Sequence, residues 1–210
     1  MKVLVPAAVA AVSFVLISNA DAGVTGPGDQ RFVSDAGDAV GGGTAAVVAN
    51  TPGAWARDGY LADGARWISL EADDGRKGPA GGVTATFSET FHGVAGGALD
   101  WAVLADDTAR VRLIDPEGVS TTLFDFNTGP NATCAGGAIG CEPGEQGTGT
   151  VALAFAGTYE FAVDVVQDAG HGGSPFGTQY AGVVTTPVPA AGGLLAGALV
   201  GLGWWRRRAG

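Results

Sequence analysis

The residues of this sequence that could support covalent catalysis gather around one histidine. His171 lies in the glycine-rich segment DAGHGGSPFG, three residues after Asp168 and three residues before Ser174. A hydroxyl, an imidazole and a carboxylate are the groups with which many hydrolases form and break a covalent intermediate. The sequence nevertheless contains no G-x-S-x-G elbow, no H-E-x-x-H zinc motif and no G-x-x-x-x-G-K phosphate loop. We therefore expect a protein that is not an enzyme, and we keep a secreted hydrolase as the third functional hypothesis.

A pair of adjacent carboxylates offers a second kind of chemistry. Asp106 and Asp107 end a predicted strand, and at the rim of a sheet their hard oxygens could coordinate Ca²⁺. The alternative is that the pair caps a turn by hydrogen bonding with the backbone. No segment matches the full calcium loop of an EF-hand. The sequence therefore implies no cofactor, with a structural calcium ion at this pair as the alternative.

Tryptophan side chains are the candidate ligand-binding groups, because aromatic faces commonly hold sugar rings. Trp101 alternates with Val103, which predicts that its indole points into the core. Trp55 and Trp67 are the candidates for ligand binding, and Trp55, between turn signals in TPGAWARDG, is the better candidate for an exposed platform. The alternative is that Trp55 packs over one end of the domain.

Two cysteines, Cys134 and Cys141, lie close together in the segment CAGGAIGC. In a chain that is exported to an oxidising compartment, this spacing predicts a local disulfide that closes one loop. Metal binding by the pair is less favoured, because no histidine lies nearby.

The elements that must position these groups are predicted to be short strands. The segment TYEFAVDVV places Tyr159, Phe161 and Val163 on one face, and VTATFSETF follows the same alternation until Glu89 interrupts its apolar face. In ARVRLIDPEGVSTTLFDF, the residues 115–118 match a type I turn and predict a hairpin. Further strands are predicted at 31–34, 44–49, 99–104, 151–155 and 180–184.

The composition supports the same class. The chain has 210 residues, of which 37 are glycine, and helix formers such as Lys, Gln and Met are scarce. Eight or nine short strands with no helix between them predict an all-β fold, an antiparallel β-sandwich or jelly roll formed by a single domain over residues 23–185.

Both ends of the sequence carry targeting signals. Residues 1–22 have the layout of a signal peptide, with Lys2, an apolar run and a small-x-small site that ends at Ala22. Between the two ends, residues 23–186 contain seven basic and 20 acidic residues, a net charge of −13. This excess of carboxylates argues against nucleic-acid binding, which needs the opposite sign.

The second targeting signal is the tail, residues 186–210. Its uncharged segment from about 190 to 205 would span roughly 24 Å as a helix, slightly less than the usual bilayer core, so it could form a transmembrane helix with the help of its flanking residues. Trp204 and Trp205 stand where interfacial aromatic residues belong, and the arginines that follow them place that end in the cytoplasm. The domain before the tail is therefore expected to face outward.

This tail resembles the C-terminal sorting signal of PEP-CTERM proteins, in which a proline motif, an apolar helix and an arginine cluster follow one another. Val-Pro-Leu-Pro-Ala is the closest form of the motif, with Thr and Val replacing its first and third residues here. The matching residues are Thr186, Pro187, Val188, Pro189 and Ala190 with Arg206, Arg207 and Arg208. The resemblance implies a Gram-negative bacterial protein that crosses the inner membrane, is recognised by an exosortase-type enzyme and reaches the cell surface or the extracellular matrix.

The central segment is also similar to galactose-binding-like jelly-roll domains found in PEP-CTERM proteins. The matching residues are Trp67-Ile68-Ser69 and Ala105-Asp106-Asp107. Together the two resemblances imply a non-catalytic surface or matrix protein associated with exopolysaccharide in a biofilm. The second hypothesis is a carbohydrate-binding module with an aromatic platform and a structural calcium ion.

Overall fold

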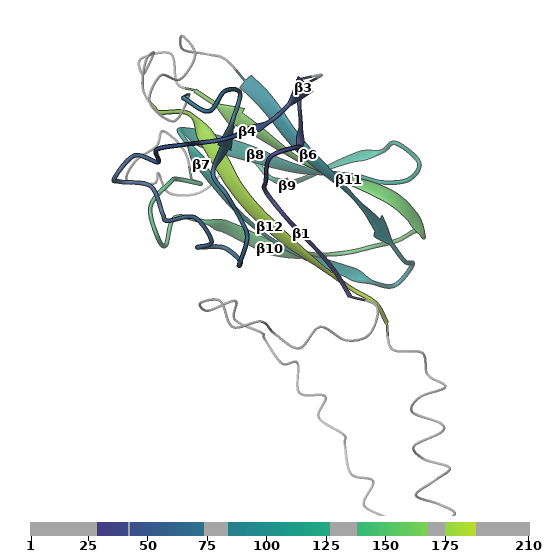
Figure 1. Ribbon diagram of the computed structural model, residues 1–210. Helices are drawn as coiled ribbons and strands as arrows, with labels where there is room; N and C mark the ends of the chain where they lie inside the picture. The colour runs from purple at the N-terminus through teal and green to yellow at the C-terminus, as the bar shows by residue number, and fades with distance from the viewer. Residues whose placement is uncertain (1–28, 42, 74–83, 127–137, 168–174, 188–210) are drawn as a thin grey trace, which may run out of the picture.

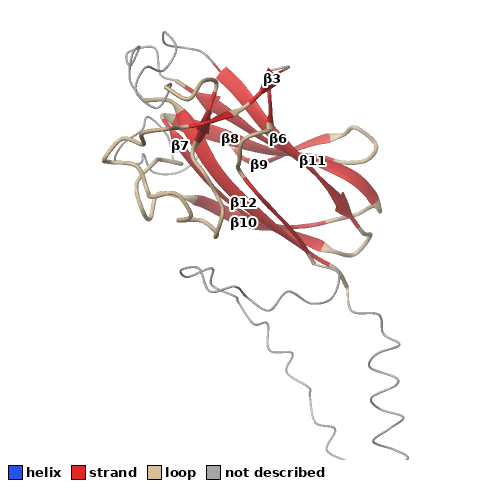
Figure 2. Cartoon of the chain, in the orientation of Figure 1, coloured by secondary structure: helices blue, strands red, loops and turns tan. Residues whose placement is uncertain are grey.

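The strands of this protein form two antiparallel sheets that face each other (Figure 1). The computed structural model describes residues 29–41, 43–73, 84–126, 138–167 and 175–187. Within these ranges all regular structure is strand, and no helix is present (Figure 2). The predicted all-β class is therefore confirmed, with the two-layer arrangement of a β-sandwich.

The first sheet is built around β12 (Gly177–Thr185), which pairs with β7 (Ala98–Asp106) along one edge. Along its other edge β12 pairs with two short strands in succession, β5 (Ile68–Ser69) and β1 (Gln30–Val33). The outer strands of this sheet are β10 (Gly147–Ala152), beside β7, and β4 (Ala46–Val47), beside β5.

The second sheet is built around β11 (Gly157–Val166), which pairs with β6 (Thr84–Gly93) on one side and β8 (Thr108–Ile114) on the other. Its outer strands are β9 (Ser120–Phe124), beside β8, and the small hairpin of β2 (Ala39–Val40) and β3 (Gly43–Thr44), beside β6. The chain changes sheets between β6 and β7 and again between β7 and β8, so Asp106 and Asp107 lie at a crossing.

The alternation read from the sequence determines which face of each strand is buried. On β11, Tyr159, Phe161 and Val163 are at most 2% exposed and lie in the main core between the sheets. Trp101 is also in this core, as predicted. The predicted hairpin joins β8 to β9, and the amide of Gly118 donates a hydrogen bond to the carbonyl of Asp115 at 2.9 Å.

Some strand boundaries differ from those predicted. The predicted segment 44–49 is divided between β3 and β4, which belong to different sheets. The segment predicted at 151–155 is shifted toward the N-terminus, because β10 begins at Gly147. Glycine in a strand generally weakens it. Here, however, a Cβ at Gly147 would collide with Ile139, and a Cβ at Gly149 would lie 2.9 Å from the indole of Trp101. The missing side chains make room for these neighbours.

Small and large residues alternate across one row of the first sheet. Gly149 of β10 stands opposite Trp101 of β7, which stands opposite Gly182 of β12, which stands opposite Phe32 of β1. The ring of Phe32 lies over Gly182 and stacks on Phe91 of the second sheet, with ring centroids 5.4 Å apart. The glycines thus allow two large rings to lie against the backbone of this sheet.

The two ends of the chain that carry the targeting predictions are not part of these sheets. No helix among the described residues is long and apolar enough to cross a membrane. The predicted signal peptide, and the predicted membrane segment at 190–205, lie outside the described residues.

Replacing Gly182 with alanine is predicted to destabilise the domain, because the new Cβ would overlap the ring of Phe32. Overpacking of this kind costs about 1–3 kcal/mol. Urea unfolding followed by tryptophan fluorescence measures the change. Gly53→Ala is the control, since a Cβ there meets no atom within 4 Å, and its effect should stay within about 0.5 kcal/mol. Equal effects of the two substitutions would contradict this packing account.

Candidate functional site

A second apolar cluster covers part of the outer face of the first sheet. It is formed by the segment between β4 and β5 packed on Ala102 and Leu104 of β7 and on Ala181 of β12. Within it the rings of Trp55 and Trp67 lie 4.1 Å apart. Trp55 is 6% exposed and Trp67 is fully buried.

The prediction that Trp55 is an exposed platform is therefore wrong, and Trp67 does not offer an open face either. The two indoles are buried because they pack over the small residues on the outer surface of the sheet. The polar edge of each ring is also occupied, because Trp67 Nε1 donates to the carbonyl oxygen of Ala56 at 2.6 Å and Trp55 Nε1 donates to Oδ2 of Asp106 at 2.6 Å. The alternative was that Trp55 packs over one end of the domain; its indole is buried, as that alternative requires, but it packs on the outer face of the first sheet.

Asp106 and Asp107 lie where the chain crosses between the sheets, and they are 6% and 2% exposed. Asp106 accepts the indole N–H of Trp55, and Asp107 Oδ2 lies 3.4 Å from Nε2 of Gln167. In the part of the chain that the structure describes, no three His, Cys, Asp or Glu side chains come together to hold a metal ion. Since Ca²⁺ takes six to eight oxygen ligands, the calcium prediction gains no support from these two residues.

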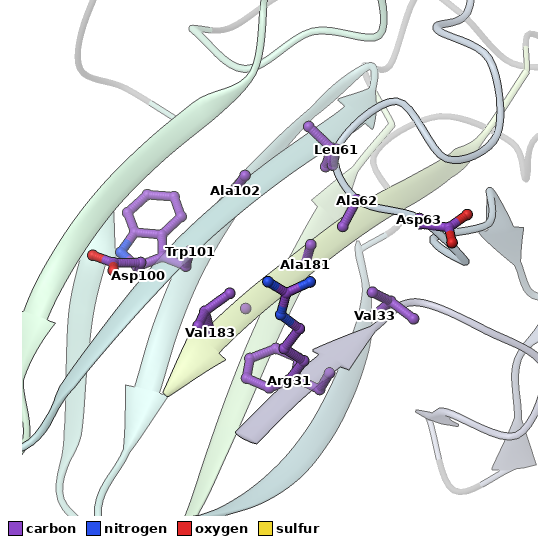
Figure 3. Close-up of a pocket in the computed structure, with 12 residues that line it drawn as sticks. Arg31, Val33, Leu61, Ala62, Asp63, Asp100, Trp101, Ala102, Ala181 and Val183 are labelled. Carbon is purple, nitrogen blue, oxygen red and sulfur yellow. The ribbon is translucent and has the colours of Figure 1, made fainter. Parts of the chain in front are cut away.

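The candidate binding site is a groove of about 200 Å³ on the outer face of the first sheet, beside the tryptophan cluster (Figure 3). We call it the sheet groove. Its floor is made of small or branched apolar residues of β7, β12 and β1, with Leu61 and Ala62 of the covering segment as one wall. The floor residues are Ala102, Ala181, Gly182, Val183 and Val33. The groove marks the place where the covering segment ends and the sheet becomes accessible.

Charged side chains surround the apolar floor of the sheet groove. Arg31 of β1 stands beside Val183 in the strand register, and Asp63 and Asp100 complete the charged lining (Figure 3). Arg31 and Asp63 are exposed, whereas Asp100 is partly buried and accepts a hydrogen bond of 2.5 Å from the hydroxyl of Thr150. The lining thus combines an apolar floor with one cationic and two anionic groups.

The dimensions of the sheet groove restrict what it can hold. Sites that enclose drug-sized ligands have volumes of about 300–1,000 Å³, so this smaller groove suits a group the size of a single ring. Trp101 contributes to the lining, but its indole belongs to the core, where its centroid lies 6.4 Å from that of Phe161. Phe32, the other aromatic residue of the lining, is 7% exposed and stacks on Phe91. Neither aromatic residue of the lining therefore offers an open platform.

A carboxylate is also buried between the sheets, a feature that the sequence analysis did not predict. Asp38, 7% exposed, accepts a hydrogen bond of 2.5 Å from the hydroxyl of Tyr180. Burial raises the pKa of Asp38, and burial together with the charge of Asp38 raises the pKa of Glu89. The same two causes raise the pKa of Tyr180. The only indication of acidic groups near the core that the sequence offered was Glu89, a carboxylate at an inward-facing position of β6.

An ion pair joins two strands on the outer face of the second sheet. Arg112 of β8 donates two hydrogen bonds of 2.6 Å to Asp164 of β11, which also accepts the hydroxyl of Thr86 at 2.7 Å. Burial alone would raise the pKa of Asp164, but the hydrogen bonds from Arg112 and Thr86 outweigh it and lower that pKa. The hydrogen bond with Asp164 likewise raises the pKa of Arg112.

Several predicted site residues lie outside the described residues. They include the hydrolase set of Asp168, His171 and Ser174, and the sorting residues from Val188 onward. Cys134 is also outside, so the disulfide stays a prediction, although Cys141 is fully buried in the tryptophan cluster. His92, the other histidine of the sequence, is exposed on β6.

Comparisons with known proteins give no relative: no family model matches the chain, and no curated protein matches it significantly.

The ion pair between Arg112 and Asp164 predicts a loss of stability in acid. The folded-state pKa of Asp164 is below its ordinary value of 3.8. The ion pair therefore contributes its full stabilisation to the folded state at pH values above 3.8, and this stabilisation is lost as the pH falls through the folded-state pKa. Asp164→Asn should cost about 1.5–3 kcal/mol at pH 7, the range for hydrogen bonds to charged groups, and this cost should decrease as the pH falls below 3.8. Urea unfolding at pH 7 and at several pH values below 3.8 measures the difference.

Asp125→Asn is the matched control for that measurement. Its ion pair with Arg110 is longer, at 3.6 Å, and both side chains are 36% exposed, so its loss should cost at most about 1 kcal/mol. An Asp164→Asn effect no larger than the control, or one that does not change with pH, would contradict the assignment.

Proposed function

We propose that this chain is an exported, non-catalytic protein of the cell surface or extracellular matrix of a Gram-negative bacterium, where it associates with exopolysaccharide. The observation that carries the proposal is how the domain joins its tail. The last strand, β12, ends at Thr185, and the proline motif begins at the next residue. Everything beyond the motif can be removed without shortening a described strand.

Both described ends of the chain support this arrangement. β1 and β12 are antiparallel neighbours in the first sheet, so the segment that enters the domain and the segment that leaves it lie side by side (Figure 1). The amide of Thr186 donates to Oδ1 of Asp29 at 3.3 Å and joins the two ends. Loss of residues 1–22 and of the segment beyond about Pro189 would leave this joint in place. An exosortase-type enzyme, acting during passage through the inner membrane, is the proposed partner.

We also propose that the sandwich is a jelly roll of the galactose-binding-like kind. Two antiparallel sheets support this proposal, as does the placement of the residues that carry the resemblance. Ile68 and Ser69 form β5 in the first sheet, and Asp106 and Asp107 lie at the crossing from β7 to β8.

The sheet groove is the proposed place of contact with polysaccharide. A sugar ring has apolar C–H faces and a circumference of hydroxyl groups, which match an apolar floor surrounded by carboxylates and a guanidinium. Arg31, Asp63 and Asp100 supply both donors and acceptors for those hydroxyls. Because two of these three groups are anionic and the whole domain is acidic, the polymer is expected to be neutral rather than anionic. The carbohydrate-binding hypothesis is thereby kept, with the groove in place of an aromatic platform.

Polysaccharide binding tests this proposal directly. The full chain in detergent should be retained on immobilised exopolysaccharide from its host, and Asp63→Ala combined with Asp100→Asn should reduce the affinity by tenfold or more, as expected when about 1.4 kcal/mol of hydrogen bonding is lost. Glu117→Gln, in the exposed turn between β8 and β9, is the control for the loss of a carboxylate elsewhere. Equal retention of both variants would exclude the groove, and no retention of the unaltered chain would refute polysaccharide association.

A further inference from the structure

Two large apolar side chains are exposed at one end of the sandwich. In the part of the chain that the structure describes, Val119 and Phe155 are the large hydrophobic residues with exposed side chains, at 56% and 39%. Val119 lies in the turn between β8 and β9, and Phe155 lies in the turn between β10 and β11. A single exposed apolar residue is ordinary on a protein surface, whereas several that adjoin form a patch that can bind a partner.

The turns that carry these two residues pack against each other. A Cβ at Gly157 would lie 2.8 Å from both Cβ and Cγ of Pro116, so the end of one turn lies directly against the other. The two turns therefore present their exposed apolar residues together. We call these residues the apolar tip, and they are Pro116, Val119, Ala154, Phe155 and Ala156.

Hydrogen bonds fix the backbone of both turns. The buried hydroxyl of Tyr159 accepts a hydrogen bond from the amide of Phe155 at 3.0 Å and donates one to the carbonyl of the same residue at 2.9 Å. In the other turn, Oδ1 of Asp115 accepts the amides of Glu117 and Val119, both at 2.9 Å. The apolar tip is thus held outward by a backbone whose polar groups are already engaged.

The tail leaves the domain at the same end of the sandwich. The turn between β6 and β7 lies beside the turn that carries Phe155, because the amide of Gly96 donates to the carbonyl of Leu153 at 2.9 Å. A Cβ at Gly96 would also lie 3.7 Å from Cγ of Pro187, in the proline motif. β12 runs toward this end and finishes at Thr185 (Figure 1). The apolar tip and the start of the tail therefore share one end of the domain.

Covalent geometry keeps this end close to the segment that is proposed to cross the membrane. Three residue steps separate Pro187 from Ala190, where the uncharged segment begins, and an extended chain covers at most about 11 Å over that distance. The headgroup layer of a bilayer is itself about 5–8 Å deep. Glu117, an exposed acid in one turn of the tip, confines any contact to headgroup level, because a charge is costly deeper in the bilayer.

We propose that the apolar tip contacts the surface of a phospholipid bilayer while the tail is in the membrane, and that this contact orients the sandwich. The contact rests on the proposed function, in which residues 190–205 cross the inner membrane. A weak contact suffices, because the tail already holds the tip at a high effective concentration beside the surface. The result is that the proline motif is held at the bilayer surface, where the proposed exosortase-type partner would meet it.

A fluorescent label tests the contact in the full chain, reconstituted into vesicles of phosphatidylethanolamine and phosphatidylglycerol. An environment-sensitive thiol dye is attached through Val119→Cys or, as the matched control, through Gly53→Cys. Gly53 lies at the opposite end of the domain, since nearby Trp55 bonds with Asp106, which stands opposite Gly177 at the start of β12. Lipids that carry a quencher should quench the label at 119 at a depth of about 5–10 Å and leave the label at 53 unquenched. The unaltered chain, treated alike, is the blank for the native cysteines.

Substitution of Phe155 shows whether the tip itself, rather than the dye, makes the contact. Phe155→Ser keeps the backbone hydrogen bonds with Tyr159 and should reduce quenching at 119 severalfold, whereas Phe155→Leu should retain it, because the contact depends on apolar surface. Undiminished quenching in the serine variant would overturn the proposal. A label at 119 that becomes buried without being quenched by lipid would indicate a second copy of the chain and would also overturn it.

Flotation of the same vesicles separates this proposal from the one on which it rests. If the chain floats with the vesicles and lipid quenches the label at 119 no more than the label at 53, the tip contact is refuted and the membrane tail stands. If the chain does not float, the membrane tail is refuted, and the tip contact fails with it.

Discussion

The separation of the two sheets depends on aromatic rings that fit only where glycine stands beside them. Phe32 lies over Gly182, and Trp101 is flanked in its row by Gly182 and Gly149. These rings then meet Phe161 from the opposite sheet. Because protein interiors are packed as densely as organic crystals, one added methyl group in this row must displace a ring, and through it the facing sheet.

The residue types on the outer face of the first sheet are explained by the same packing constraint. Its inner side is filled by large rings, whereas its outer side presents small residues such as Ala102 and Ala181, which another layer must cover. The indoles of Trp55 and Trp67 supply that cover. Each indole N–H has an oxygen acceptor, as buried polar groups require. The sheet groove begins where this cover ends, so its position depends on how far the covering segment extends.

Alternation predicted most strands and the core face of β11, because strand periodicity depends on neighbouring residues alone. It could not predict that Trp55 is buried, since that depends on an apolar surface formed by β7 and β12, distant in sequence. Likewise the burial of Asp38 could not be predicted, since its hydrogen bond with Tyr180 joins residues that are distant in sequence. The sheet groove was missed for the same reason, since its lining comes from four separate segments.

The central claim is that this sandwich is a self-contained body between two removable targeting segments, with β1 and β12 as its paired limits. Intact mass spectrometry of the protein recovered from the native host tests it most directly. The account predicts a species in the medium or matrix that lacks residues 1–22 and the segment beyond about Pro189. A species in the inner membrane that still contains Trp204 to Gly210 would contradict it.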